Sequence, residues 1–487
     1  MSSNSRTDAL WGLLEPDAVK VARPVLRGPG RSNALGLPDQ LSHSSARCSA
    51  SFDEPNLLVS AGLIPAVRLA QKVGLLELAE QHVSAGANPG AKVMSLVAGM
   101  AAGADSIDDL DVLRRAGAGR VFTGVRAPST LGTFLRGFSF GHVRQLDAVA
   151  ARVLAGLADT APLLPGIHDG CVIDIDDTVK PVFGPGKQGA QFGYTKIRGL
   201  NAQLATISTA EAAPVIAATR LRRGAAPSSH GAVRMIRDAI ATARRCGASG
   251  HILVRADSAY CSSAILKAVS KTGARFSVAM PLNRRVQAAI STIDEVAWVR
   301  IEYPWAIPDP ETGELISAAE IAEIPFTAFT SKPKAKHVSA RLIVRRIPER
   351  NATKLQDPLF PAWRYHALFT DNPDPLAAAE SIHRGHAIVE QVIADLKNSA
   401  LAHLPSGRFP ANAAWLVCAA IAFNLTRALG VLAGGNLTKA TTATIRTRLI
   451  NVPARIARSA RKLRLHLPRD WTWELHWQRL WTAVMTT

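Results

Sequence analysis

The 487-residue chain is strongly basic, with 57 Lys and Arg residues against 38 Asp and Glu residues and a formal net charge of +19. A hydrophobic share of 47% with 20% charged residues indicates a globular protein with a substantial core and excludes a largely disordered chain. A chain this basic usually binds a polyanion, and nucleic acid is the commonest one in a cell. A soluble protein that is merely basic remains the alternative.

The cysteines and the apolar runs indicate the cellular compartment of the protein. The five cysteines lie far apart, which excludes a dense disulfide scaffold and a close-paired zinc site. The N-terminal residues lack the basic-then-apolar order of a signal peptide, and the longest apolar run, 413–423, is too short to span a bilayer. We expect free thiols, a buried helix over that run, no membrane partner and a cytoplasmic protein.

The first third of the chain divides in two. Residues 1–50 are rich in Ser, Gly, Pro and Arg without periodicity, which predicts a flexible tail. Residues 51–165 are rich in Ala and Leu at helical spacing, as in the run 66–76. They are interpreted as a helical DNA-binding domain.

The sequence pattern changes from helix-like to strand-like at Cys171. A β-branched run, 171–179, is followed at hairpin-like spacing by two further strand-like segments, 200–209 and 213–221. Two later strand-like segments, 251–258 and 276–281, alternate with the helix-like stretches 228–246 and 259–272. This order predicts an α/β fold with a mixed sheet flanked by helices, over residues 166–281 and 376–430.

The remaining segments have their own composition. Residues 282–375 contain many prolines and alternating apolar stretches, which predict a β-rich insertion. A strong helix is predicted from about 377 to 398 and an apolar one from 410 to 429. Residues 431–487 are interpreted as a basic C-terminal region, because 441–487 holds nine Lys and Arg against two acids.

Acidic residues occur where two predicted strands end. Asp174 and Asp176 are two apart, so on a strand both lie on one face, and Asp257 ends the apolar run 251–256. An acid at the carboxyl edge of a buried strand stands where α/β folds place their sites. The alternatives are that Asp177 and Thr178 start a turn that Asp176 caps, and that Asp257 only caps a helix.

A third acid lies on the predicted helix 377–398. At about 100° per residue, His383, His386, Glu390 and Lys397 fall within about 60° of one another, beside an apolar stripe. An ordinary solvated flank would look the same. Three carboxylates suit Mg²⁺, which takes a few carboxylates together with phosphate oxygens. Such sites serve phosphoryl transfer.

The arrangement of Asp176, Asp257 and Glu390 resembles that of the DDE transposases, which have a ribonuclease-H-like core. Four motifs resemble more closely the insertion-sequence 1380 group. They are Asp174-Ile-Asp-Asp-Thr178, Gly189-Ala-Gln-Phe-Gly-Tyr-Thr-Lys-Ile-Arg-Gly199, Val254-Arg-Ala-Asp-Ser258 and His403-Leu-Pro-Ser-Gly-Arg-Phe409. The resemblance covers roughly residues 55–470.

The resemblance implies that Asp176, Asp257 and Glu390 are catalytic and bind two Mg²⁺ ions, with Mn²⁺ able to substitute. It implies cut-and-paste cleavage and strand transfer on double-stranded DNA, at terminal inverted repeats and a target. A homodimer on DNA and a nucleoid-associated location follow from this. Related enzymes carry Tyr-x2-Arg-x3-Glu-x6-Lys on the glutamate helix; here His383 and His386 replace the Tyr and the Arg, while Lys397 matches.

Basic and aromatic residues supply further expectations. Candidate DNA contacts are His383, His386 and Lys397, with the cations Lys196, Arg198, Arg222, Arg223 and Arg408, although a solvated basic face is the alternative for each. Trp298, Trp305 and Trp363 could stack on an extruded base or could belong to the core.

Two other functions remain open. Val172-Ile-Asp-Ile-Asp-Asp-Thr-Val179 also fits the DxDxT signature of haloacid-dehalogenase-like phosphohydrolases, which would make Asp174 a nucleophile. Under the transposase interpretation, cleavage should survive Asp174→Ala. The third possibility is a catalytically inactive DNA-binding protein descended from a transposase.

Overall fold

The computed structural model describes residues 49–301, 319–348, 363–459 and 462–486. The predicted tail 1–50, except for its last two residues, lies outside the described residues, and so does Trp305. Contacts divide the chain into Met1–Asp53 and Glu54–Thr487, and the description below concerns the second of these units.

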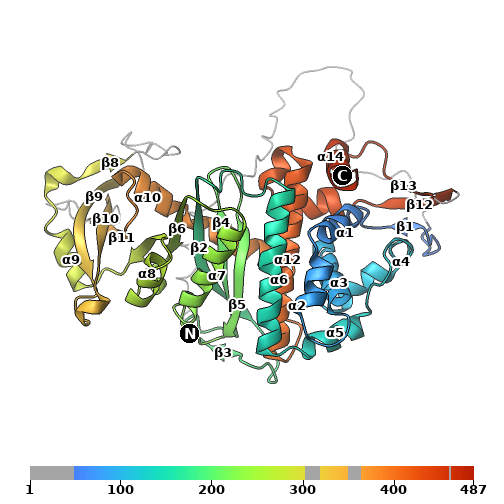
Figure 1. Cartoon of the computed structure of the whole chain (residues 1–487), viewed down its shortest axis with the longest axis horizontal. Coiled ribbons are helices and arrows are strands. Elements are labelled where there is room, and N and C mark those ends of the chain that lie inside the picture. Colours follow the sequence, from blue (N-terminus) through green and yellow to red (C-terminus); the bar gives the residue numbers. More distant parts are fainter. Residues whose placement is uncertain (1–48, 302–318, 349–362, 460–461, 487) are drawn as a thin grey trace, which may run out of the picture. The chain divides into compact units, whose positions relative to one another are not determined.

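The N-terminal part of this unit is helical, as the sequence predicts (Figure 1). Its six α-helices are α1 (Leu63–Lys72), α2 (Leu75–His82), α3 (Pro89–Ala102), α4 (Ala118–Val121), α5 (Pro128–Arg136) and α6 (Phe140–Thr160). The longest, α6, begins at a capping box, because the Ser139 hydroxyl accepts from the His142 amide while the His142 ring contacts the Ser139 amide.

A ten-stranded mixed sheet forms the centre of the described chain, with the order β3-β4-β2-β6-β7-β11-β10-β9-β8 and β5 paired to β4. The first part comprises β2 (Gly170–Pro181), β3 (Gln191–Phe192), β4 (Arg198–Ser208), β5 (Val215–Arg223), β6 (His251–Ala256) and β7 (Arg275–Met280). β2, β6 and β7 are parallel, whereas β4 runs antiparallel to β2 and β5. The predicted mixed α/β sheet is confirmed.

The segment predicted as a β-rich insertion continues the same sheet. It contains α9 (Arg284–Ile290), β8 (Val299–Ile301), β9 (Ala319–Ala328), β10 (Val338–Pro348) and β11 (Trp363–Thr370). β11 pairs antiparallel with β7, so that no break separates these strands from the central ones. The insertion is therefore joined to the core by backbone hydrogen bonds.

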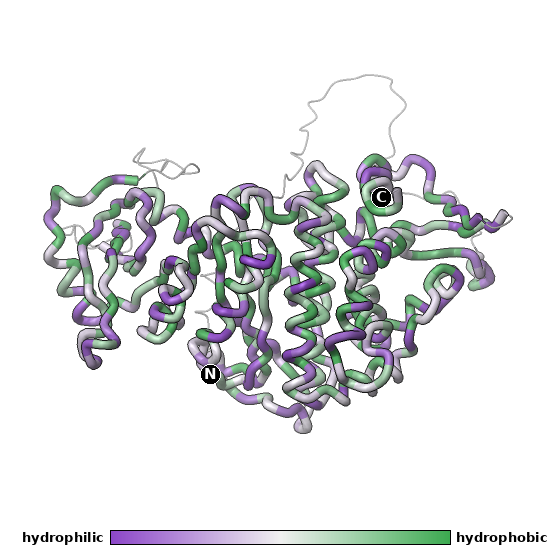
Figure 2. Tube along the Cα trace, viewed as in Figure 1, coloured by the Kyte–Doolittle hydropathy of each residue, from purple (hydrophilic) through white to green (hydrophobic). Residues whose placement is uncertain are grey.

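Helices pack against the sheet. Within the described residues they are α7 (Ala232–Arg245), α8 (Ser263–Ser270), α10 (Leu376–Arg384), α11 (Ile388–Lys397) and α12 (Phe409–Ala433). α12 contacts β5, α6 and α3 and has almost all of its residues buried, which confirms the predicted buried helix. It is long and apolar enough to span a membrane by composition alone, yet protein covers most of its surface, and Figure 2 shows its apolar run.

The outer edge of β5 is covered by a side chain of α12. Asn424 accepts from the Ile216 amide through Oδ1 (2.8 Å) and donates to the Ile216 carbonyl through Nδ2 (2.8 Å). These contacts satisfy backbone groups that an edge strand would otherwise leave open.

The basic C-terminal region is folded in its described part. It contains α13 (Thr442–Ile445), β12 (Ala454–Ser459), β13 (Lys462–His466) and α14 (Glu474–Met485). β12 pairs with β1 (Leu57–Leu58), and α14 contacts α12 and α1. The C-terminal residues therefore complete the core of the N-terminal helices.

One predicted helix is interrupted. The continuous helix expected over 377–398 is wrong, because α10 and α11 are separated by a 3-10 turn, Gly385–Ala387. Arg255 causes the break: its guanidinium donates to the carbonyls of Ile382 and Gly385, and a Cβ on Gly385 would collide with it.

Candidate active site

The three acids of β2 lie on different faces of the sheet, because successive side chains of a strand point to opposite sides. Asp174 and Asp176 lie on the face that α11 crosses, and Asp177 lies on the opposite face. Asp174 is fully buried, while Asp176 and Asp177 are partly exposed. The three neighbouring carboxylates therefore have three different surroundings.

Asp174 is held in a buried ion pair. Arg255, at the paired position of β6, donates from Nε to Oδ1 and from Nη2 to Oδ2, both at 2.7 Å. His386 Nδ1 lies 2.8 Å from Asp174 Oδ1, and because a carboxylate only accepts, this nitrogen carries the proton. With both oxygens engaged and no exposure, Asp174 has no access to a substrate, which disfavours the dehalogenase-like nucleophile.

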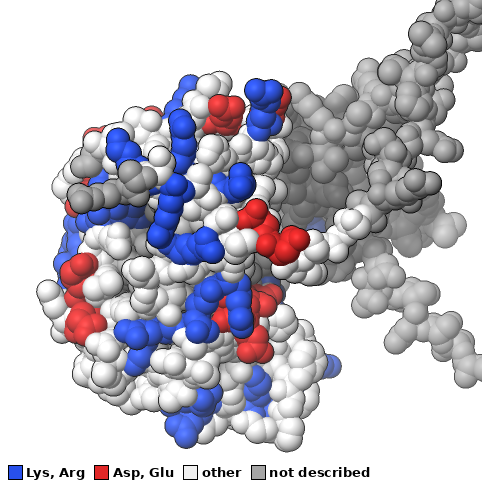
Figure 3. Space-filling view, turned by 90° about the vertical axis from the view of Figure 1, so that its right-hand side faces the viewer, with Lys and Arg blue, Asp and Glu red and all other residues white. Residues whose placement is uncertain are grey.

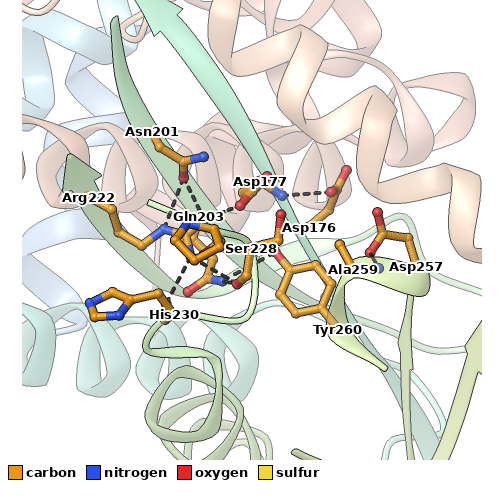
Figure 4. Close-up of polar contacts among 11 residues, drawn as sticks. Asp176, Asp177, Asn201, Gln203, Arg222, Ser228, His230, Asp257, Ala259 and Tyr260 are labelled. Atoms are coloured by element: carbon orange, nitrogen blue, oxygen red, sulfur yellow. Dashed lines mark hydrogen bonds and ion pairs between the residues drawn. The ribbon is translucent and has the colours of Figure 1, made fainter. Parts of the chain in front are cut away.

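Asp176 and Asp257 come together where the parallel pairing of β2 with β6 ends. The last paired residues are Ile175 and Ala256, and an aspartate follows each of them. Asp257 comes directly after β6, as predicted, whereas Asp176 lies inside β2, which continues to Pro181, so the predicted strand end at Asp176 is wrong. Figure 4 shows the two side chains near each other, with Asp257 accepting from the Ala259 amide (3.0 Å) and Asp176 accepting from the Asp177 amide (2.7 Å). Both predicted strand-end acids thus belong to one site.

The two carboxylates are destabilised in their charged form. Burial, with a smaller contribution from the negative charge of Asp257, raises the pKa of Asp176 to about 6, although the hydrogen bond from the Asp177 amide and the nearby His386 act to lower it. Burial also raises the pKa of Asp257, while the Ala259 amide and His386 lower it. A cation between the two aspartates would relieve this cost.

Glu390 lies in the first turn of α11, the helix that packs against β2. His386, before this helix, contacts Asp174, and at its end Lys397 Nζ lies 3.2 Å from Thr178 Oγ1. The buried face of α11 is formed by Val389, Val392, Ile393 and Leu396, whereas the side chain of Glu390 is exposed. The structure therefore places Glu390 on a helix that borders the aspartates but does not bring it into contact with them.

The three predicted acids do not form a closed ligand set. Within the described residues, no three His, Cys, Asp or Glu side chains are arranged to hold a metal ion. The oxygen donors nevertheless suit a hard cation, and the raised pKa values of Asp176 and Asp257 show that these two carboxylates lack full compensation. In donor chemistry the residues fit Mg²⁺.

A polar network supports the other face of β2 (Figure 4). Arg222 donates to Asp177 and to Asn201 Oδ1, and its Nη1 also donates to the carbonyls of Pro227, Ser228 and His230. Gln203 donates to the Ser228 carbonyl (2.9 Å) and the Tyr260 hydroxyl (3.2 Å). Arg222 is buried and donates to this whole set of protein acceptors, which argues against its predicted role as a DNA contact.

The two predicted phosphate-binding histidines differ. His383 Nδ1 contacts Ser277 Oγ at 3.0 Å, and burial together with the charges of His386 and Arg255 lowers the His383 pKa to about 3. His383 is therefore neutral at physiological pH and supplies no positive charge. His386 stacks near it, with ring centroids 6.4 Å apart, and is oriented by Asp174.

Of the other predicted DNA contacts, Lys196, Arg223 and Arg408 are exposed. Arg408 donates to the Arg136 carbonyl (3.0 Å), and Arg198 donates to the carbonyls of the loop 182–185. Lys and Arg cover more surface than Asp and Glu on the face that carries α4, β12 and β13 (Figure 3). On this face, therefore, the excess of basic residues in the sequence lies at the surface.

The two described tryptophans of the insertion, Trp298 and Trp363, both stack against one arginine. The Arg346 guanidinium lies 4.2 Å from the ring centroid of Trp298 and 4.3 Å from that of Trp363. Glu295 and Glu320 pair with the same arginine. Stacking of either indole on a base therefore requires Arg346 to move.

Sequence reasoning missed Arg255, which organises this site. The available signal was a charged residue inside the apolar run 251–256, which demands a buried partner. Its register with Asp174 could not be obtained from the sequence, because it depends on which strands become neighbours.

A comparison with known families decides the identity. The family described as transposase DDE domain group 1 matches residues 42–486, nearly the whole chain. The chain belongs to this DDE transposase family. No curated protein matches the sequence. The matched residues contain the N-terminal helices and the elements from β12 to α14 as well as the sheet that carries Asp176 and Asp257. All of these parts therefore belong to the DDE transposase family's shared sequence.

Proposed function

We propose that this DDE transposase cleaves DNA at the ends of an insertion sequence of the 1380 group and transfers the strands by a cut-and-paste mechanism. Asp176, Asp257 and Glu390 are its catalytic residues and bind two Mg²⁺ ions, for which Mn²⁺ can substitute. The observation that carries the proposal is the convergence of Asp176 and Asp257 where the parallel pairing of β2 with β6 ends, with raised pKa values.

The sheet supports the proposed ribonuclease-H-like core. β5, β4, β2, β6 and β7 form a mixed sheet with α7 and α8 packed against it, and α11 crosses β2 on the face of Asp176. Bound Mg²⁺ would activate the attacking oxygen and stabilise the leaving one.

The chain's own residues hold this site in place. Arg255 joins Asp174 on β2 to carbonyls at the end of α10, and His386, in the turn before α11, contacts the same carboxylate. Lys397 contacts Thr178 at the other end of α11. In the proposed mechanism Glu390, in the first turn of this anchored helix, approaches the two aspartates when a cation binds.

The proposed substrate is double-stranded DNA, at terminal inverted repeats and at a target, bound by a homodimer in the nucleoid of the cytoplasm. The net charge of +19 and the exposed cations Lys196, Arg223 and Arg408 support a polyanionic partner.

The test is cleavage of a supercoiled plasmid that carries the element's ends, identified as inverted repeats beside the gene, in Mg²⁺ or Mn²⁺. Asp176→Asn, Asp257→Asn and Glu390→Gln should each abolish cleavage while DNA binding persists. Glu77→Gln is the matched control, because Glu77 is an exposed acid in the first turn of α2, as Glu390 is in the first turn of α11.

Two results would contradict the proposal. DNA binding without cleavage under any divalent cation would indicate the inactive DNA-binding descendant. Hydrolysis of a small phosphate ester that requires Asp174 and leaves a covalent aspartyl-phosphate would indicate the dehalogenase-like enzyme.

A further inference from the structure

The hairpin of β3 and β4 exposes large side chains to solvent. Phe192 is 65% exposed and Tyr194, in the turn, is 103% exposed. Ile197 follows the turn and Phe183 precedes the hairpin, and both are exposed as well. Exposed aromatic residues on one short element indicate a surface used for contact.

The backbone of this hairpin is held rigidly at its base. Gly193, Gly199 and Gly224 lie where a Cβ would collide with a neighbouring carbonyl: that of Gly224, Lys180 and Gly199, respectively. The Gly224 amide donates to the Gly189 carbonyl (3.1 Å). These close approaches account for the glycines of the motif 189–199, but they leave its aromatic residues without a structural role.

Arg198 fixes the adjoining loop. Its Nη1 donates to the carbonyls of Val182 (3.3 Å) and Gly184 (3.0 Å). The turn itself closes through the Lys196 amide and the Gly193 carbonyl (3.0 Å), with Lys196 in the left-handed region at a φ of 56°. Tyr194 and Phe192 are thus presented on a fixed support, which lowers the entropic cost of binding.

The charge around the hairpin selects the partner. Between Asp177 and Glu211 the sequence contains four cations, Lys180, Lys187, Lys196 and Arg198, and no acid. A second copy of the chain would bring the same positive charge to the contact, whereas nucleic acid would bring the opposite charge.

The hairpin lies a short way from the acids. β2 runs five residues from Asp176 to Pro181, and Pro181 pairs with Gly199 at the base of the hairpin. The hairpin continues beyond Gly199, away from Asp176: Phe192 pairs with Arg198, one residue farther, and Tyr194 lies in the turn. Six to eight residues of strand span about 20–26 Å, which is about six to eight base pairs of duplex at 3.4 Å each. A duplex that extends from Asp176 in the direction of β2 therefore reaches the hairpin.

We propose that the β3–β4 hairpin is a DNA-stacking element, in which Tyr194 and Phe192 contact unstacked bases about six to eight base pairs from the reacting phosphate while Lys196 binds the backbone. This inference rests on the proposed function and adds a base-contacting surface to it. Apolar and aromatic wedges of this kind unstack a base step and bend the duplex.

The experiment uses the full chain and a duplex with the element's end, in which 2-aminopurine replaces single bases on either side of the cleavage point. Wild-type protein should raise 2-aminopurine fluorescence at about the sixth to eighth base pair. The double variant Phe192→Ala/Tyr194→Ala should lose this rise and bind about 5- to 100-fold more weakly. Tyr194→Phe should retain both signals, because the ring is kept.

Two further variants sharpen the result. Leu475→Ala removes a side chain of similar exposure (70%) from α14 and should change neither signal. Lys196→Ala should reduce the slope of log affinity against log salt by about 1 and leave the fluorescence rise in place. Circular dichroism and urea midpoints of all variants should match the wild type, since the changed side chains are exposed.

Wild-type fluorescence and affinity in Phe192→Ala/Tyr194→Ala, with Mg²⁺-dependent cleavage by the wild type, would overturn the hairpin proposal alone. Weaker self-association of that variant with unchanged DNA binding would overturn it in favour of a dimer contact. Failure of the wild type to bind or cleave the duplex would overturn the proposed function together with the hairpin.

Discussion

The ion pair between Asp174 and Arg255 should dominate the stability of the site. Both side chains are buried, and removal of one partner leaves an uncompensated charge, at a cost of about 3–5 kcal/mol. We predict that Asp174→Asn lowers the free energy of unfolding by this amount, a large part of the roughly 5–15 kcal/mol that holds a typical protein folded. With a urea m-value of about 3 kcal/mol/M, the midpoint falls by on the order of 1 M.

The same change should loosen the end of α10 and the 3-10 turn that precedes α11, because Arg255 and His386 join this segment to Asp174. Hydrogen exchange at residues 382–390 should accelerate, and cleavage should fall as a consequence. This replaces the expectation from the sequence that cleavage survives the loss of Asp174, because the structure shows that Asp174 holds the segment before α11. Asp174→Leu/Arg255→Met, which removes both charges, should recover most of the lost stability. A midpoint shift below about 0.3 M in Asp174→Asn would refute the reasoning, since it corresponds to about 1 kcal/mol.

Three further predictions concern single side chains. The folded-state pKa of Asp176, about 6, exceeds its ordinary value of 3.8, so the folded state binds the extra proton and stability falls as pH rises from about 4 to 6. Asp176→Asn should therefore raise the urea midpoint at pH 7.5 in EDTA but not at pH 4, and an equal effect at both pH values would contradict this. His383→Asn should leave the salt dependence of DNA binding unchanged, because His383 is neutral beside Ser277; a flatter slope would show that it carries charge. Asn424→Ala should cost about 2–4 kcal/mol in urea unfolding, because it strips two partners from the Ile216 backbone, and a loss under 1 kcal/mol would argue that water replaces them.

Local patterns were sufficient to predict much of the fold. The alternation and β-branched composition of 171–179 and the apolar run 251–256 predicted β2 and β6, and the helical spacing of 51–165 predicted α1 to α6. The break between α10 and α11 escaped prediction because its cause is not local: Arg255, 130 residues earlier, accounts for it by donating to the Gly385 carbonyl. A contact of that separation has no signature in the spacing of the helix itself.

The site shows the same division. The strand-end argument located Asp257 correctly, because β6 ends at Ala256, whereas Asp176 lies inside β2, which extends to Pro181 through its pairing with β4. The selection of free cations was less successful: Arg222 and Arg223 are neighbours in the sequence, yet Arg222 is buried among carbonyls and Arg223 is exposed. Charge composition indicates that a basic surface exists, but only packing decides which arginine reaches it.

The segment Asp174-Ile-Asp-Asp177 shows how one strand gives three equal side chains different tasks. Alternation separates Asp177 from the other two and directs it to Arg222. The parallel register then separates Asp174 from Asp176: Asp174 is paired with Arg255, whereas Asp176 is level with Asp257. A shift of β6 by two residues would place Arg255 beside Asp176 and neutralise the carboxylate proposed to bind metal. The buried ion pair at Asp174 thus fixes the register that leaves Asp176 and Asp257 without a full countercharge, and that shortage is what a divalent cation would satisfy.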